Sequence, residues 1–331
     1  MKRRMKGNLL KRLMVLGLLA ITLLCLWMGS AQAQAMHTIR ITVGQRGNWD
    51  TTMAFMTGEK EGFFAKEGIK LDLFYTRGGA ETLQPVSTGN AEFGWANGTF
   101  GVLGAYEKGG KIKIVSAEFT GADLFWYVKA DSPYKKFQDL EGKKVGFSSA
   151  GSSSNLMILR MAELAGVKLE AVAAGGIPDN YTAVMTGQIA AGWSAPPYRI
   201  EEAKKGTIRI IARGSDFPEL QGITFRVNIG NADYVKKNPD VARAFFRAYQ
   251  KALDYSYSNL KVVIPEFAKL NKIPLEIAEE SLKFFPQKGM ALAPIAGLEY
   301  QNEKAVEFGF LKKKLTQEQL NDLVDLSYLQ K

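Results

Sequence analysis

The sequence predicts an α/β protein that folds into two lobes, each an open β-sheet flanked by helices. Three observations carry this prediction. Short β-branched apolar runs alternate with helical segments from residue 38 onward, which is typical of open sheets with right-handed crossovers. The alternation restarts near residue 124. Beyond residue 227 only helices are expected, and they need a sheet face to cover.

The N-terminal residues predict a secretory signal peptide over residues 1–33. Six basic and no acidic residues come first, an apolar stretch over 13–27 follows, and small residues end at Ala33, which together form the three-part pattern of such a peptide. The apolar stretch of about 15 residues is shorter than the roughly 20 that a membrane-spanning helix needs. Cleavage after Ala35 is an alternative, and a lipid anchor at Cys25 is disfavoured because the bulky Leu24 precedes it. We therefore expect a periplasmic protein.

The chain beyond the signal peptide is nearly neutral and lacks cysteine. The full chain has a net charge of +10, and without its first 33 residues the charge is about +4, too little to predict nucleic-acid binding. The only cysteine is Cys25, which excludes a disulfide, a thiol nucleophile or a cysteine-ligated metal in the mature chain. The only histidine, His37, lies beside the cleavage site. We expect no enzymatic activity, no cofactor and no metal site, although a carboxylate pair assembled from distant segments stays open.

The first lobe is predicted to comprise residues 36–123 and 223–331. Asp50 is expected to cap the helix that begins at Thr51, and Gly78 and Gly79 are expected to open the next helix. Thr316 and Gln319 form a capping box for the last helix. The strands of this lobe are expected at 39–43, 69–74, 91–95, 112–117 and 223–227, and its later helices at 239–258, 274–285 and 297–311.

The second lobe is predicted to comprise residues 124–222. The segments at 124–128 and 223–227 would be the two crossings between the lobes. Strands are expected at 124–128, 144–148, 190–194 and 208–212, and helices at 155–165, 181–186 and 197–205. Such an arrangement leaves a cleft at the carboxyl ends of the strands, where open α/β sheets bind ligands.

Polar and aromatic residues follow several predicted strands of the first lobe. An arginine offers a planar fork of donors that suits a carboxylate or sulfonate, and a tryptophan offers a flat apolar wall. The alternative is an arginine on the surface and a tryptophan in the core. The candidate ligand-binding residues of this lobe are Gln45, Arg46, Asn48, Trp49, Arg77, Gly78, Trp95, Asn97, Gly98 and Thr99.

A serine-rich segment in the second lobe precedes a predicted helix. Hydroxyl groups and free amides at a helix N-terminus can hold an anion without a formal positive charge. The segment lacks the Gly-Lys-Ser/Thr of a P-loop and the Gly-x-Ser-x-Gly of a nucleophile elbow. The alternative is an ordinary helix cap. The candidates of this lobe are Ser148, Ser149, Ser152, Ser153 and Ser154, with Asn180, Trp193 and Ser194 across from them.

Four segments together resemble the periplasmic binding proteins of nitrate/sulfonate/taurine-type ABC importers, the group with the NMT1/THI5-like domain. They are Gly58–Ile69 (GEKEGFFAKEGI), Gly89–Gly94 (GNAEFG), Phe137–Gly146 (FQDLEGKKVG) and the serine-rich run before Leu156. The resemblance covers about residues 38–270. Each motif is weak alone, and they are specific in combination.

This resemblance implies a two-lobed fold of the type II, Venus-flytrap kind, a partner permease that the protein contacts directly, and an ATPase. It implies ligand contacts at residues 45–49, 95–99, Thr120 and 148–154. The thiamine-precursor relatives carry a Pro-Asn…His pattern after the first strand, where this chain has Arg46–Asp50, and the eukaryotic enzymes need a cysteine-rich motif that is absent here. A pyrimidine ligand and a synthase activity are therefore disfavoured.

The sequence thus predicts a monomeric solute-binding protein of an ABC importer that captures a small organic anion, of the sulfonate or carboxylate type, in the cleft between its lobes. Two alternatives stay open. One is an exported enzyme that uses a cleft carboxylate on a small acid, which would require a buried acid with a shifted pKa. The other is a TRAP-type or sensory receptor of the same fold.

Overall fold

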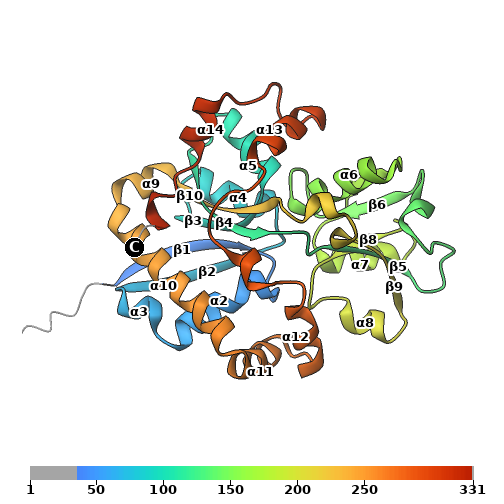
Figure 1. Cartoon of the computed structure of the whole chain (residues 1–331), viewed down its shortest axis with the longest axis horizontal. Coiled ribbons are helices and arrows are strands. Elements are labelled where there is room, and N and C mark those ends of the chain that lie inside the picture. Colours follow the sequence, from blue (N-terminus) through green and yellow to red (C-terminus); the bar gives the residue numbers. More distant parts are fainter. Residues whose placement is uncertain (1–35, 330–331) are drawn as a thin grey trace, which may run out of the picture. The chain divides into compact units, whose positions relative to one another are not determined.

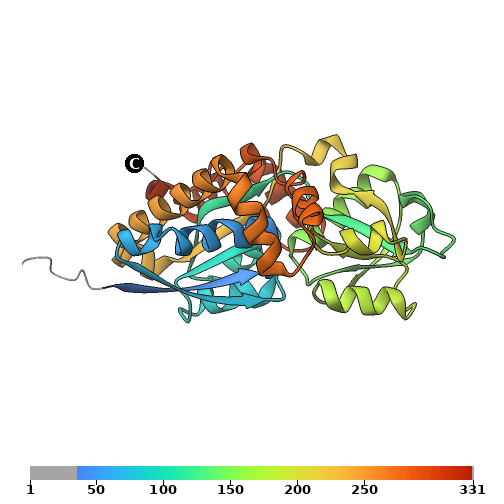
Figure 2. The ribbon, with the colours of Figure 1, turned by 90° about the horizontal axis from the view of Figure 1, so that it is seen from below.

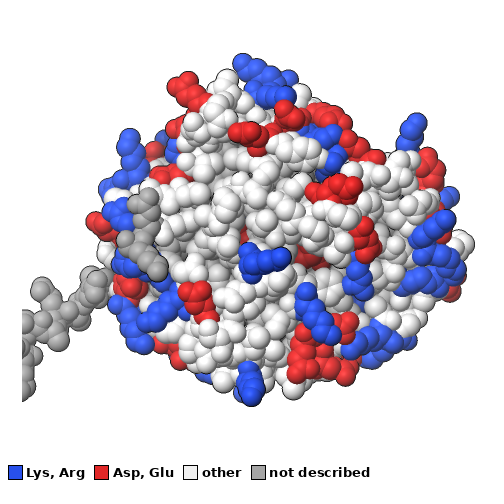
Figure 3. Space-filling model, in the orientation of Figure 1, with Lys and Arg blue, Asp and Glu red and all other residues white. Residues whose placement is uncertain are grey.

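The computed structural model describes residues 36–329, so the predicted signal peptide lies outside the described residues. The chain from His37 onward forms one compact unit. Within the described residues, every helix is too short or too polar to cross a membrane. Figure 3 shows that basic and acidic side chains are interspersed on the face that it presents, without a large patch of one sign.

The first sheet has five strands in the order β2-β1-β3-β10-β4 (Figure 1). Strand β1 pairs in parallel with β2 and β3, whereas β10 runs antiparallel to both of its neighbours, β3 and β4. The strand bounds are β1 (His37–Gly44), β2 (Ile69–Thr76), β3 (Phe93–Gly98), β4 (Ile112–Thr120) and β10 (Thr224–Asn231). All five were predicted, and β10 is longer than expected because its buried pairing continues to Asn231.

The second set of strands repeats this pattern. A three-stranded sheet β8-β5-β9 and a parallel pair β6-β7 are joined by a bridge between Val145 and Ala191, which gives the order β7-β6-β8-β5-β9. Strand β5, like β10 in the first sheet, runs antiparallel to both of its neighbours. The bounds are β5 (Phe125–Lys129), β6 (Lys144–Phe147), β7 (Glu170–Ala173), β8 (Gly192–Ser194) and β9 (Ile208–Arg213). The antiparallel strand of each sheet is therefore one of the two predicted crossing segments.

Helices cover the sheets (Figures 1 and 2), and α10 returns to the first sheet as expected, whereas α12, which also follows β10, contacts α8 through Lys204. Phe245 and Tyr249 of α10 pack against Trp95 of β3 and Phe55 of α2. The α-helices are α2 (Trp49–Lys60), α3 (Phe63–Lys66), α4 (Ala80–Ser87), α5 (Thr99–Glu107), α6 (Ser153–Ala165), α7 (Ile177–Met185), α8 (Ile200–Lys204), α9 (Ala232–Lys237), α10 (Pro239–Ser258), α11 (Leu260–Asn271), α12 (Leu275–Leu282), α13 (Leu298–Glu307) and α14 (Gln317–Leu323). The 3₁₀ turns are η1 (Phe137–Leu140), η2 (Gly214–Asp216), η3 (Pro218–Leu220), η4 (Gln287–Met290) and η5 (Ser327–Leu329).

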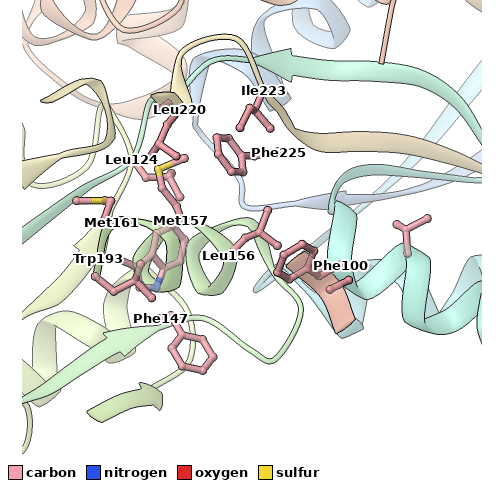
Figure 4. Close-up of a cluster of buried hydrophobic side chains, with 14 of the residues drawn as sticks. Phe100, Leu124, Phe147, Leu156, Met157, Met161, Trp193, Leu220, Ile223 and Phe225 are labelled. Carbon is pink, nitrogen blue, oxygen red and sulfur yellow. The ribbon is translucent and has the colours of Figure 1, made fainter. Parts of the chain in front are cut away.

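One buried cluster joins the two sheets beside the crossing segments. Leu124 precedes β5 and Ile223 precedes β10, and both belong to a cluster that also contains Leu156 of α6 and Trp193 of β8 (Figure 4). Side chains from both lobes thus share one apolar core at the point where the chain crosses between them. This core supports the inner ends of the strands, where the predicted ligand-binding residues lie.

Two predicted caps have different outcomes. The Thr316 hydroxyl accepts from the Gln319 amide and the Gln319 side chain accepts from the Thr316 amide, which confirms the capping box. The prediction that Asp50 caps α2 is wrong, because α2 begins at Trp49 after Asn48, and Asp50 lies inside the first turn. The Asp50 carboxylate is buried and is paired with Arg226 instead.

Two helix starts and one strand also differ from the predictions. Helix α7 begins four residues before Tyr181, because Asp179 caps its first turn by accepting from the Gly176 amide. Helix α8 begins only at Ile200, since Arg199 has a left-handed backbone conformation (φ 68°) that a right-handed helix does not contain. Strand β7 was not predicted, because its four residues alternate weakly and are half-buried or exposed.

Candidate functional site

A small cavity lies where the carboxyl ends of strands from both sheets meet. Gln45 follows β1, Gly98 ends β3, Ser148 follows β6, and Trp193 lies in β8. The remaining lining residues are Gly44, Asn48, Asp50, Thr51, Gly78, Gly79, Ala96, Leu124, Ser152, Ser153 and Arg226. Its volume is about 30 Å³, which is room for one or two water molecules. Open α/β sheets bind their ligands at this edge.

Arg226 forms the floor of the cavity together with three buried carboxylates. Its Nε donates to Glu118 Oε2 at 2.7 Å, Nη1 to Asp123 Oδ1 at 2.9 Å, and Nη2 to Asp50 Oδ2 at 3.0 Å. The four residues come from β10, β4, the segment before β5, and α2, and all are buried. The arrangement therefore ties the crossing strand β10 to the helix that follows β1.

The acids in this cluster outnumber the single base. Burial raises the pKa of Glu118 well above its ordinary value, Arg226 opposes that shift, and Asp50 adds to it. Burial also raises the pKa of Asp123. The pKa of Arg226 is raised by its acidic neighbours although burial opposes this, so the guanidinium stays charged. A proton retained on Glu118 would reduce the excess of negative charge at the floor.

The raised pKa of Glu118 predicts an unusual dependence of stability on pH. The folded state holds the proton where the unfolded chain, with a pKa of about 4.3, has released it. The stability that the proton on Glu118 contributes is complete below the unfolded-state pKa, and it is lost as the pH rises through the folded-state pKa. We expect the free energy of unfolding of Glu118→Gln, relative to the parent protein, to rise with pH between about 4.5 and 8. Urea unfolding of both proteins across this range measures the difference, and a constant difference would contradict the assignment.

Four oxygens of the cavity and its floor lack a hydrogen-bond donor. Oδ1 of Asn48 and Oδ1 of Asp50 belong to residues that line the cavity, and Oε1 of Glu118 and Oδ2 of Asp123 lie behind them. All four are buried acceptors, and a buried acceptor without a partner costs about 1–3 kcal/mol. The floor therefore offers acceptors to whatever occupies the cavity.

The serine-rich segment forms the opposite wall and is largely bonded to itself. The Ser152 hydroxyl caps α6 by accepting from the Asn155 amide at 3.2 Å, and the Ser154 hydroxyl accepts from the Ser148 amide at 3.0 Å. Ser148, Ser152 and Ser153 line the cavity. The segment is thus a helix cap whose residues also line the cavity, and its role in holding an anion stays a prediction.

The two lobes touch around the cavity. The amide of Gly101, in α5, donates to the carbonyl of Gly151 at 3.0 Å, and the Tyr198 hydroxyl donates to the carbonyl of Arg46. A β-carbon on Gly98 would lie only 2.6 Å from the backbone nitrogen of Ser153. With these contacts in place, the cavity is too small for an organic molecule.

The structure brings eight of the predicted site residues to this cavity. They come from five separate stretches of the chain in both lobes, which the fold gathers at one edge. They are Gln45, Asn48, Gly78, Gly98, Ser148, Ser152, Ser153 and Trp193.

Other predicted site residues lie outside the cavity wall. Trp49 and Trp95 are core residues, because both are fully buried and their indole nitrogens donate to Tyr257 and Tyr249. Arg46 is exposed beside the ring of Tyr75. Arg77 is exposed and paired with Glu81. Both arginines thus correspond to the surface alternative.

The remaining predicted residues serve neighbouring structure. The Thr99 hydroxyl donates to the backbone carbonyls of Thr224 and Phe225. The Thr120 hydroxyl bonds to the Thr224 hydroxyl, and the Ser194 hydroxyl donates to the Tyr198 carbonyl. The amides of Asn97 and Asn180 donate to backbone carbonyls. The Ser149 hydroxyl is buried without a partner beside Gly79. The Ser154 hydroxyl is hydrogen bonded to the Ser148 hydroxyl.

The charged floor was not predicted from the sequence. Glu118 lies in β4 and Arg226 in β10, strands that are buried along most of their length, and Asp123 lies two residues before β5. A charge inside a buried strand is rare unless it is paired, so these positions carried a signal. What the sequence cannot supply is their pairing, because the strands are more than a hundred residues apart along the chain.

Comparisons with known proteins agree with this fold. A candidate binding protein of Brucella abortus is 27% identical over 284 residues, which cover 81% of this chain and 85% of that protein. A 4-amino-5-hydroxymethyl-2-methylpyrimidine phosphate synthase of Saccharomyces cerevisiae is 24% identical over 235 residues, covering 63% of this chain and 65% of the enzyme. The structure of the alkanesulfonate-binding protein of Xanthomonas axonopodis pv. citri bound to MOPS superposes with a TM-score of 0.73 at 17% identity and covers 88% of this chain and 99% of that one.

The last comparison shows that the fold is that of the periplasmic binding proteins, as the resemblance implied. The family described as NMT1/THI5 like matches residues 49–260, a stretch that includes both crossing strands and most of the cavity wall. The chain belongs to the NMT1/THI5-like family.

Proposed function

We propose that this protein is the extracytoplasmic solute-binding protein of an ABC importer. It captures a small solute in the cavity between its lobes and delivers it to a permease. The observation that carries this proposal is the cavity itself, which is assembled from strand ends of both sheets and can admit a ligand only when the lobes separate. A site of this kind couples binding to closure, because groups from both lobes engage only when the cleft is shut.

The division of the chain supports the same function. The proposed lobes are residues 36–123 with 223–331, and residues 124–222, and the chain passes between them beside Leu124 and Ile223. Two crossings act as a pair of hinges that allow opening and constrain its direction. The binding proteins among the similar molecules support solute capture, and we propose a permease and an ATPase as partners and the periplasm as location.

An enzymatic function is the second candidate, because buried acids do lie at the cleft floor. Each of the three carboxylates, however, is held by the guanidinium of Arg226, which fixes it in place. The resemblance implies that the eukaryotic synthases need a cysteine-rich motif, and the single cysteine of this chain, Cys25, falls in the predicted signal peptide. Capture without chemistry is therefore the better supported function.

A thermal-shift panel tests the proposed function. The sequence favours an organic anion, whereas the floor carries more acids than bases, so the panel contains sulfonates, carboxylates, nitrate and amines. A ligand at 100 times its dissociation constant adds about 2.7 kcal/mol to the free energy of unfolding. We expect at least one class to raise the Tm and to make the protein more compact in solution scattering. A Tm that no class changes would contradict the proposal.

A further inference from the structure

We propose that the solute presents a positively charged, hydrogen-bond-donating nitrogen group, an ammonium or amidinium, to Asp50 and Asn48 at the cavity floor. This inference rests on the proposed function and adds the chemical class of the ligand. It departs from the anion that the sequence predicts.

The cavity floor has more hydrogen-bond acceptors than donors. Asn48 and Asp50 both line the cavity, both are more than nine-tenths buried, and each has an oxygen without a donor. An ionised carboxylate can only accept hydrogen bonds, so no rotation of Asp50 lets it serve an acceptor ligand. A proton on Glu118 would be shared with Asp50, and it cannot serve Asn48 and Asp123 as well. The missing donors therefore have to come from the occupant.

The charges at the cavity floor favour a cationic solute over an anionic one. Arg226 is the only basic residue that lines the cavity, and its guanidinium already serves three carboxylates. An anion that approached it would meet Asp50 in the wall, with Glu118 and Asp123 directly behind. Like charges within a few ångströms are strongly disfavoured at a buried site. A cation would instead relieve the excess of negative charge and replace its own lost hydration with carboxylate contacts.

The cavity wall suits an apolar tail on the rest of the solute. Trp193 and Leu124 provide the large apolar side chains of the cavity wall. An indole face is the best aromatic partner for a cation, and it also covers a short hydrocarbon tail. The serine hydroxyl groups opposite can donate or accept, so they accommodate either polarity. The site therefore fits a compact amine or amidine with an apolar tail.

Two matched sets of compounds test this inference by calorimetry on the mature protein. One set is butylammonium, butanol, butyrate and butanesulfonate, and the other is benzylammonium, benzyl alcohol, benzoate and benzenesulfonate. Within each set the carbon skeleton is constant and the charge changes. We expect the ammonium member of at least one set to bind about tenfold or more tightly than its neutral and anionic partners.

Variants test whether the ammonium group binds at the cavity floor. Asp50→Asn is expected to weaken ammonium binding by about tenfold or more, since a charge-assisted hydrogen bond is lost. Because this change also disturbs Arg226, Asn48→Asp provides a second variant, and aspartate is as favourable as asparagine before a helix. It is expected to keep or tighten ammonium binding. Glu92→Gln is the control, because Glu92 is a buried acid whose partner is Arg40.

The possible outcomes separate the inference from the proposed function. Binding of a sulfonate, carboxylate or alcohol in preference to the ammonium compound overturns the inference and leaves the proposed function standing. Ammonium binding that Glu92→Gln weakens as much as Asp50→Asn also overturns it. If none of the eight compounds binds, and no solute is released on denaturing protein purified without refolding, both the inference and the proposed function are wrong.

Discussion

Replacing Arg226 with methionine is expected to lower the free energy of unfolding by about 3–5 kcal/mol, the usual cost of removing one partner from a buried ion pair. The change leaves Asp50, Glu118 and Asp123 buried without the guanidinium that holds them. Methionine has a similar length and packs well, so the loss reports charge more than volume. The loss should be smaller at pH 5 than at pH 7.5, because the pKa values of Glu118 and Asp123 are raised by burial and these two acids take up protons more readily as the pH falls. Urea unfolding at pH 5 and pH 7.5 measures both effects.

Arg247→Met is the matched control for this prediction. Arg247 pairs with Glu67 on the surface, and about half of the arginine side chain is exposed. Pairs of this kind contribute about 0–1 kcal/mol, because solvent screens the charges. If Arg226→Met were no more destabilising than Arg247→Met, the carboxylates would have to be neutral in the folded protein and the charged floor would be the wrong description.

Replacing Gly98 with alanine is expected to weaken solute binding by about tenfold or more while leaving the free protein folded. The added methyl would lie 2.6 Å from the backbone nitrogen of Ser153 across the cleft, so the lobes could not reach the arrangement seen here. Overpacking of this kind costs about 1–3 kcal/mol. Gly98 has φ −63° and ψ 131°, which alanine adopts without strain, so the opened protein should be unaffected. Calorimetry with a solute identified by the panel measures the affinity, and solution scattering measures closure.

Gly222→Ala controls for the loss of a glycine as such. A β-carbon at Gly222 would meet no atom within 4 Å. This variant should therefore bind and close like the parent protein. Equal affinities of the Gly98→Ala and parent proteins would show that binding does not require the lobes to meet at Gly98.

The fold was largely predictable from the sequence, because its strands are marked by local patterns. The β-branched run at 39–43 and the apolar run at 208–212 lie within β1 and β9, and the apolar run at 124–128 is offset by one residue from β5. The short β7 was missed, because four half-buried or exposed residues carry little periodic signal. Helix α8 was placed too early, since the left-handed conformation of Arg199 precedes its start and no local pattern marks that conformation.

The candidate site was predictable only in part. Residues at strand ends, such as Gln45, Ser148 and Trp193, reach the cavity because the topology of an open sheet brings them there. Trp49 was placed in the ligand site but lies in the core, because one residue's shift along α2 decides which side a side chain faces. The pairing of Arg226 with Asp50 depends on tertiary contact alone, and no local pattern marks it.

A crystal structure of the protein purified from the periplasm without refolding, or soaked with the tightest-binding compound of the panel, tests the central claim most directly. The account predicts a solute enclosed between Asp50, Ser152 and Trp193, with a nitrogen of the solute within hydrogen-bonding distance of the Asp50 carboxylate. A solute in the separate groove beside Arg213, Lys283 and Lys288, with only water between the lobes at Asp50, would contradict it.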